Sequence, residues 1–121
     1  MADPNTVLYY LYNIFNDKPY MNNRRIFPTQ QRDVQNLVES VKNDPNVKRL
    51  IIFGSSVTPL CNPWSDIDAY YEMEEDKPRP DYVCENAVDV WTSFTVDEDL
   101  LKEIKRKGVV VYERDSIRQS L

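Results

Sequence analysis

Two aspartates separated by one residue, Asp66 and Asp68, are the side chains of this sequence best suited to chemistry. Side chains two positions apart on a β-strand point to the same face, so a strand here would hold both carboxylates together. Two such charges about 4 Å apart repel by roughly 4 kcal/mol at an effective dielectric constant near 20, before solvent reduces the cost. A cation relieves that repulsion, and Mg²⁺ prefers oxygen ligands and is commonly shared with substrate phosphates. The pair therefore favours a Mg²⁺ site over an acidic strand that only faces solvent.

A glycine-serine turn stands upstream of this pair. Gly54 and Ser55 follow the apolar run 50–53, and ten residues separate them from the first aspartate. A glycine lets the backbone approach a phosphate closely. We expect Ser55 to hydrogen-bond a phosphate, because a chain without histidine lacks the usual base that activates a serine nucleophile. Ser56 would add a second hydroxyl or a backbone donor, and a plain strand-ending turn is the alternative for the whole segment.

A third carboxylate, Asp89, interrupts the apolar segment 87–91. If the fold places it beside Asp66 and Asp68, the three carboxylates can hold two Mg²⁺ ions. One ion would activate an attacking hydroxyl, and the other would neutralise a triphosphate and its leaving group. Asp89 would also be the candidate base that receives the hydroxyl proton. The alternative for Asp89 is an exposed position on a half-buried sheet.

Composition excludes several other kinds of chemistry. The chain has no histidine, which removes Ser-His and Cys-His dyads and the usual zinc sites. Its net charge is −5, whereas the segment from Asp66 to Asp99 alone carries −10, which suits a segment that holds cations between flanks that can meet phosphates. Residues 72–81 within it are instead expected to form a solvated acidic loop. Overall acidity argues against a dedicated nucleic-acid surface.

Length and hydropathy predict a single cytoplasmic domain without a membrane partner. No apolar run approaches the roughly 20 residues that cross a bilayer, and the first residues lack the features of a signal peptide. Cys61 and Cys84 are then expected to be reduced thiols. The 121 residues divide into an N-terminal helix and arm (1–28), a core (29–114) and a tail (115–121). The oligomeric state stays open, a homo-oligomer included.

Alternation of apolar and polar residues predicts the strands that position these side chains. The predicted strands are 48–53, 66–73, 87–94 and 109–112. In the second of them, Asp66, Asp68, Tyr70 and Glu72 would share one face of the sheet. Trp64 and Trp91 are expected to pack in the interior, with stacking on a base as the alternative role.

Helical periodicity and capping residues predict three helices. The first covers 4–16, and the second runs from an N-cap at Thr29 to about Asn43. The second helix has an apolar stripe made of Val34, Leu37, Val38 and Val41. Thr95 and Glu98 have the spacing of a capping box that starts the third helix, and Gly108 is expected to end it as its C′ residue.

Together these motifs resemble a minimal nucleotidyltransferase of the DNA polymerase β superfamily. That family has a strand, a Gly-Ser turn, about ten residues, an Asp-x-Asp pair and a third acid on a following strand. This chain matches with Gly54 and Ser55, Asp66 and Asp68, and Asp89. Many small members continue the turn with a small residue, an arginine and a glycine, where this chain has residues 56–59 without a basic side chain.

The resemblance implies an α+β fold, a mixed sheet of about four strands flanked by helices, with the site on one face. It implies Mg²⁺-dependent transfer of a nucleoside monophosphate from a nucleoside triphosphate to an acceptor hydroxyl, with release of pyrophosphate. Asp66, Asp68 and Asp89 would be the metal ligands and catalytic acids, and Gly54, Ser55 and Ser56 would contact the nucleotide. The acceptor, a protein included, and the preferred base stay open.

The alternative function is that of an interaction module. Small members of this family resemble the antitoxin half of a toxin–antitoxin pair with a small helical toxin, with weak or no catalysis of their own. The tyrosine-rich segment 4–16 offers a docking surface for such a partner. The two functions are compatible, because such antitoxins can transfer AMP to the partner.

Overall fold

The computed structural model describes residues 20–58, 61 and 64–115. Its centre is one four-stranded sheet with the order β3-β2-β1-β4. The strands are β1 (Val47–Phe53), β2 (Ile67–Met73), β3 (Val88–Thr92) and β4 (Val109–Glu113). β1 pairs antiparallel with β2 and with β4, whereas β2 and β3 are parallel. This mixed sheet with flanking helices confirms the predicted α+β class.

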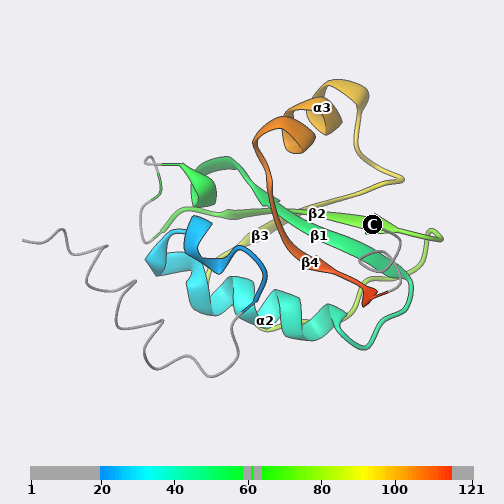
Figure 1. The fold of residues 1–121 in the computed structure, drawn as a ribbon, viewed down its shortest axis with the longest axis horizontal. Coiled ribbons are helices and arrows are strands. Elements are labelled where there is room, and N and C mark those ends of the chain that lie inside the picture. The colour runs from blue at the N-terminus through cyan, green and yellow to red at the C-terminus, as the bar shows by residue number, and fades with distance from the viewer. Residues whose placement is uncertain (1–19, 59–60, 62–63, 116–121) are drawn as a thin grey trace, which may run out of the picture.

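Two helices cover opposite faces of the sheet (Figure 1). α2 (Gln31–Val41) lies against one face, where the larger core cluster forms. α3 (Glu98–Lys107) lies against the other face, where a smaller cluster joins Ile104 to Phe53 and Tyr70. The sheet is therefore the middle of three layers.

Alternation in β2 assigns its side chains to the two faces as predicted. Ile67, Ala69, Tyr71 and Met73 belong to the core cluster on the α2 side. Tyr70 packs on the α3 side, which places Asp68, two residues before it, on that side as well. The face that carries Asp68 is thus the face that α3 covers only in part.

The apolar stripe of α2 is buried as predicted: it consists of Val34, Leu37, Val38 and Val41. The predicted N-cap at Thr29 is wrong. Residues Pro28–Gln30 form a 3₁₀ turn, and α2 begins only after Gln30, whose side chain makes no capping hydrogen bond. A proline at the start of the turn fixes φ there, which favours this tight entry over a threonine cap.

The start of α3 also differs from the prediction. Asp97 is the N-cap, and its Oδ1 accepts the N–H of Leu100 at 2.8 Å. The hydroxyl of Thr95 instead accepts the N–H of Thr92 at 2.9 Å, so it closes the turn after β3. The capping-box spacing from Thr95 to Glu98 did not identify the N-cap, because Asp97 also offers an acceptor and lies two residues closer to the helix.

Gly108 ends α3 as predicted, but for a different physical reason. It is the C-cap with extended backbone (φ −69°, ψ 158°), and its N–H donates to the carbonyl oxygen of Ile104 at 2.7 Å. A Cβ at this position would lie 2.5 Å from the Cγ2 of Ile51. Close packing of the helix end on β1, and not a left-handed backbone, therefore requires glycine here.

The predicted helix 4–16 and most of the predicted tail lie outside the described residues. Within residues 20–58, 61 and 64–115, no helix is long and apolar enough to span a membrane.

Candidate functional site

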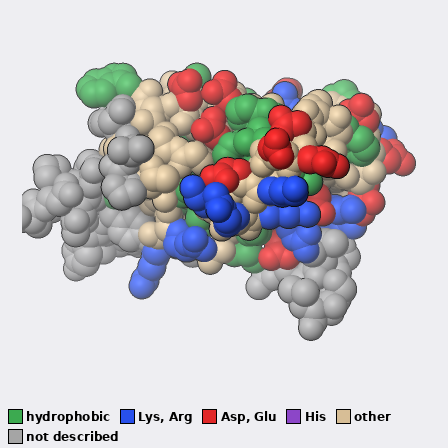
Figure 2. All heavy atoms as spheres, turned by 90° about the horizontal axis from the view of Figure 1, so that it is seen from above, with side chains coloured by type: hydrophobic (Ala, Val, Ile, Leu, Met, Phe, Trp, Pro, Cys, Tyr) green, Lys and Arg blue, Asp and Glu red, His purple; other side chains and the backbone are tan. Residues whose placement is uncertain are grey.

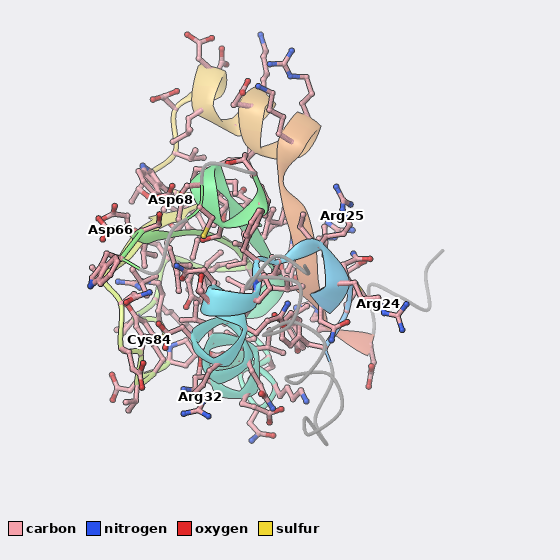
Figure 3. All side chains as sticks on the ribbon, turned by 90° about the vertical axis from the view of Figure 1, so that its left-hand side faces the viewer. Arg24, Arg25, Arg32, Asp66, Asp68 and Cys84 are labelled. Atoms are coloured by element: carbon pink, nitrogen blue, oxygen red, sulfur yellow. The ribbon has the colours of Figure 1, made fainter. Side chains whose placement is uncertain are left out.

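The parallel pairing of β2 and β3 brings two of the predicted carboxylates together. Asp68 and Asp89 are direct neighbours in the register of these strands. Asp66 lies immediately before β2, and Figure 3 shows Asp66 and Asp68 on the same side of the molecule below α3. Asp66 and Asp89 are exposed, whereas Asp68 is half-buried. All three predicted acids thus lie at one end of the β2–β3 pair.

The glycine turn lies directly against this acidic group. Gly54 has φ +73°, a left-handed conformation that side chains rarely adopt. A Cβ built on Gly54 would collide with the carboxylate Oδ2 of Asp68. The antiparallel register explains this contact, since Phe53, which precedes Gly54, pairs with Asp68. Gly54 is therefore required both by its backbone and by the carboxylate beside it.

Burial and neighbouring charges act on Asp68 in the same direction. Burial raises the pKa of the Asp68 carboxyl above its ordinary value, and the charges of Asp89 and then Asp66 raise the pKa further. Each cause disfavours a bare negative charge at this position. A cation shared by these carboxylates would reverse that effect.

The described residues fit Mg²⁺ by the chemistry of their donor atoms. Asp66, Asp68 and Asp89 offer oxygen atoms alone, which Mg²⁺ prefers over mixed nitrogen and sulfur sites. Among the described residues, no group of three or more acidic or cysteine side chains is already arranged to hold an ion. Mg²⁺ commonly uses one or two carboxylates and completes its shell with water and substrate phosphates. The adjacent pair Asp68 and Asp89 suits that incomplete kind of site.

The two predicted serines of the turn differ in access. The 3₁₀ turn Gly54–Val57 contains both, and Ser55 is half-buried. Ser56 is fully buried, and its hydroxyl has no hydrogen-bond partner in the described part of the chain. The carbonyl of Ser56 accepts the N–H of Phe27 at 3.0 Å, which ties the turn to the segment before α2. Ser55 is thus the more accessible of the two candidates for a phosphate.

The tryptophans divide between the two roles considered for them. Trp91 is half-buried and packs on Phe53, with ring centroids 5.4 Å apart, as predicted. The prediction that Trp64 is packed is wrong, because its side chain is 84% exposed. Trp64 precedes β2 in a segment without strand alternation, so no sheet face buries it.

Basic and acidic side chains lie close to one another on the α3 side of the molecule. Figure 2 shows Lys and Arg along the lower edge of this face and acidic side chains mainly above them. In the last turn of α3, Arg106 and Lys107 both pair with Glu103, at 2.8 and 3.0 Å. This part of the basic group is a solvated helix end whose charge is largely matched within the helix.

Two polar residues of the site region had no place in the predictions. Gln30 and Asp33 are buried at the start of α2 and contact the segments that lead into β2 and β3. The sequence carried one signal for them. Positions 30 and 33 have the helical spacing that leads to Leu37 in the apolar stripe. The polar side chains at these two positions are therefore expected to face the interior.

A family model described as a nucleotidyltransferase domain matches residues 34–118 of the chain. Searches of curated proteins and of solved structures found no match. The matched segment contains the glycine turn and all three carboxylates, and it begins one residue after Asp33.

Proposed function

Since the chain belongs to the nucleotidyltransferase domain family, we propose that it transfers a nucleoside monophosphate from a nucleoside triphosphate to an acceptor hydroxyl. The observation that carries the proposal is the contact between the Gly54 turn and the Asp68 carboxylate, beside Asp89. A phosphate turn and an acidic pair in contact are what phosphoryl chemistry with a metal ion needs.

In the proposed reaction, the acceptor oxygen forms a bond to the α-phosphorus, and the bond from that phosphorus to the bridging oxygen breaks. The bonding electrons leave with pyrophosphate, and the hydroxyl proton passes to a base. Mg²⁺, when bound, would supply positive charge that neutralises the triphosphate and the departing pyrophosphate. The adjacent pair Asp68 and Asp89 would hold it, with Asp66 as a third candidate ligand at the same end of the strands.

The different exposure of the two paired carboxylates suits different roles. Asp68 is half-buried against Gly54 and is well placed to hold a cation in a fixed position. Asp89 is exposed on β3, where an acceptor hydroxyl can reach it, so we assign it the role of base. Gly54 and Ser55 would contact the triphosphate through backbone and hydroxyl groups. We also propose that Trp64, whose side chain is exposed, stacks on the base.

The first experiment is calorimetric titration of ATP and GTP into the protein, with and without Mg²⁺. We expect saturable binding that requires Mg²⁺ and is lost in Asp68→Ala. Glu72→Gln is the matched control, because Glu72 lies on the same strand and face but pairs with Arg49. Labelled nucleotide and Mg²⁺ should then show transfer that Asp68→Asn abolishes in a protein that remains folded.

The alternative function, an interaction module for a small helical partner, is tested with the same samples. If folded protein binds neither nucleotide with Mg²⁺, the proposed transfer is wrong and the alternative is favoured. Co-purification with the product of an adjacent reading frame would then support it directly.

A further inference from the structure

The first turn of α2 buries three polar side chains. Gln30 and Gln31 have no exposed surface, and Asp33 is only 5% exposed. Buried amides and carboxylates are unfavourable unless they are hydrogen-bonded. Gln31 serves the preceding segment, since its Nε2 donates to the carbonyl oxygens of Asn23 and Ile26. Gln30 and Asp33 reach in another direction, toward the acidic end of the sheet.

Asp33 holds the segment that leads into β3. Its Oδ1 accepts the N–H of Glu85 and its Oδ2 accepts the N–H of Asn86, each at 2.9 Å. Hydrogen bonds to an ionised acceptor are stronger than those between neutral groups. Both amides lie shortly before Asp89, so this carboxylate fixes where the third acid enters the sheet.

Gln30 connects the same segment to the start of β2. Its Nε2 donates to the carbonyl oxygen of Ser65 at 3.1 Å, and its Oε1 accepts from Nδ2 of Asn86 at 3.5 Å. The N–H of Ile67 then donates to the carbonyl oxygen of Ala87 at 2.9 Å. The segments that lead into β2 and β3 are therefore both tied to α2, just before the residues at which the two strands begin to pair.

The parallel pairing needs such a tie, because no hairpin turn sets its register. The chain runs from the end of β2 to the start of β3 through residues 74–87. A slip of two residues would keep every side chain on its face of the sheet. At about 3.3 Å per residue, it would nonetheless move Asp89 roughly 6.6 Å along the strand and away from Asp68.

We propose that Asp33 and Gln30 are positioning residues of the carboxylate site, and that they hold the register that places Asp89 beside Asp68. Their role in catalysis rests on the proposed function, whereas their role in the register does not. Both residues precede the segment that the family model matches, so the inference concerns what this chain adds to that segment.

The test compares Asp33→Asn with Asp44→Asn in the full chain. Asp44 is the matched control, because its Oδ1 also accepts a backbone N–H, that of Asn46 at 2.9 Å, but beyond the other end of α2. Two readouts need no catalysis: Mn²⁺ affinity measured by electron paramagnetic resonance, and cross-strand NOEs with amide exchange in β2 and β3. Gln30→Met, which keeps the length of the side chain without its hydrogen bonds, is the second variant and carries the test if Asp33→Asn does not fold.

We expect Asp33→Asn to weaken Mn²⁺ binding by about 10-fold or more, the usual effect of losing a group that orients metal-binding residues. The Ile67 amide should exchange faster and the β2–β3 NOEs should weaken. In Asp44→Asn, the Mn²⁺ affinity, the Ile67 exchange rate and the NOEs should all be those of the wild type. In a transfer assay at saturating metal concentration, kcat should fall while KM for the nucleotide changes little, because the Gly54 turn is untouched.

Unchanged Mn²⁺ affinity in both Asp33→Asn and Gln30→Met would overturn the proposal, whatever their thermal stability. If the wild type binds no Mn²⁺ and transfers no nucleotide, the proposed function fails by itself. The register then decides the inference. β2–β3 NOEs that change in Asp33→Asn but not in Asp44→Asn support it, and NOEs that do not change in Asp33→Asn reject it.

Discussion

Two carboxylates on the same face of β2 have opposite electrostatic surroundings. The pKa of Asp68 is raised by burial and by Asp89 and Asp66, so its charge is opposed by the fold. Glu72, four residues further along the same strand and face, lies 2.9 Å from the guanidinium of Arg49. The hydrogen bond and charge of Glu72 raise the pKa of Arg49. Glu72 is therefore a stabilising partner of Arg49, whereas Asp68 is held in place against electrostatic repulsion.

We predict that Asp68→Asn raises the free energy of unfolding in metal-free buffer by about 0.5–2 kcal/mol, as relief of a strained functional site commonly does. Glu72→Gln should lower it by up to about 1 kcal/mol, the usual range for a partly exposed ion pair. Urea titration followed by circular dichroism measures both changes. A loss of stability in Asp68→Asn equal to that in Glu72→Gln would contradict the assigned repulsion.

The two glycines of the chain provide a second comparison of site and scaffold. Gly54→Ala should lower the free energy of unfolding by more than about 1 kcal/mol, because φ there is positive. It should also weaken nucleotide binding, since the new Cβ displaces the Asp68 carboxylate. The new Cβ in Gly108→Ala would instead press on Ile51 and on the Ile104 carbonyl oxygen. This substitution should therefore destabilise the fold but leave nucleotide affinity unchanged. Equal loss of affinity in both variants, measured by calorimetry in folded samples, would show that Gly54 has no special place in the site.

At the scale of elements, α3 depends on a cap that its sequence only partly revealed. Asp97→Ala removes the acceptor for the Leu100 N–H and should lower the free energy of unfolding by about 1 kcal/mol. Thr95→Ala removes only the turn contact to Thr92. Amide exchange should therefore become faster at Leu100 in Asp97→Ala and stay slow in Thr95→Ala. The reverse pattern would restore Thr95 as the cap.

Strands and apolar stripes were predictable because each depends on a local period. The burial of Val34 and Leu37 and the alternation around Tyr70 follow from spacing alone. Element starts were less predictable, because several nearby side chains can accept the same N–H groups, as Thr95 and Asp97 show. The order of the strands, β3-β2-β1-β4, was beyond periodicity and was not predicted, because the family resemblance implied only a mixed sheet of about four strands.

The candidate site was predictable where one short segment contains it and less so where it spans the chain. Gly54, Asp66 and Asp68 share one motif, and their proximity follows from antiparallel pairing. Asp33 was missed because its partners, the amides of Glu85 and Asn86, lie far along the chain. No local pattern indicates such a contact. A carboxylate on the apolar side of a helix indicates that a partner must exist, but not which residue it is.

At the scale of the whole molecule, buried thiol and phenol groups link stability to alkaline pH. Burial, followed by the charge of Asp33, raises the pKa of the Cys84 thiol to about 12. An unfolded cysteine has a pKa near 8.5, so between about pH 8.5 and 12 the unfolded chain binds fewer protons at this group. The stability contributed by the half-buried Cys84 thiol is thus complete below pH 8.5 and decreases as pH rises.

We therefore predict that the free energy of unfolding decreases from pH 7.5 to pH 10 under reducing conditions, and that this decrease is smaller in Cys84→Ala. Raised pKa values of Tyr70 and Tyr112 add to the same trend above pH 10, and they are present in both proteins. Urea titrations at the two pH values give the comparison. An identical decrease in both proteins would mean that Cys84 titrates like an exposed thiol.

The parallel pairing of β2 and β3 also predicts that the carboxylate site forms late in folding. A parallel pair can form only after a long loop has closed, and here two like charges oppose the last step. Among the described residues, β3 is moreover an edge strand that pairs with β2 alone, and edge elements open before the core does. A molecule that has gained its hydrophobic core would thus not yet have the carboxylate site at which we propose that a nucleotide binds. On mild heating, ligand binding should disappear while most of the secondary structure persists.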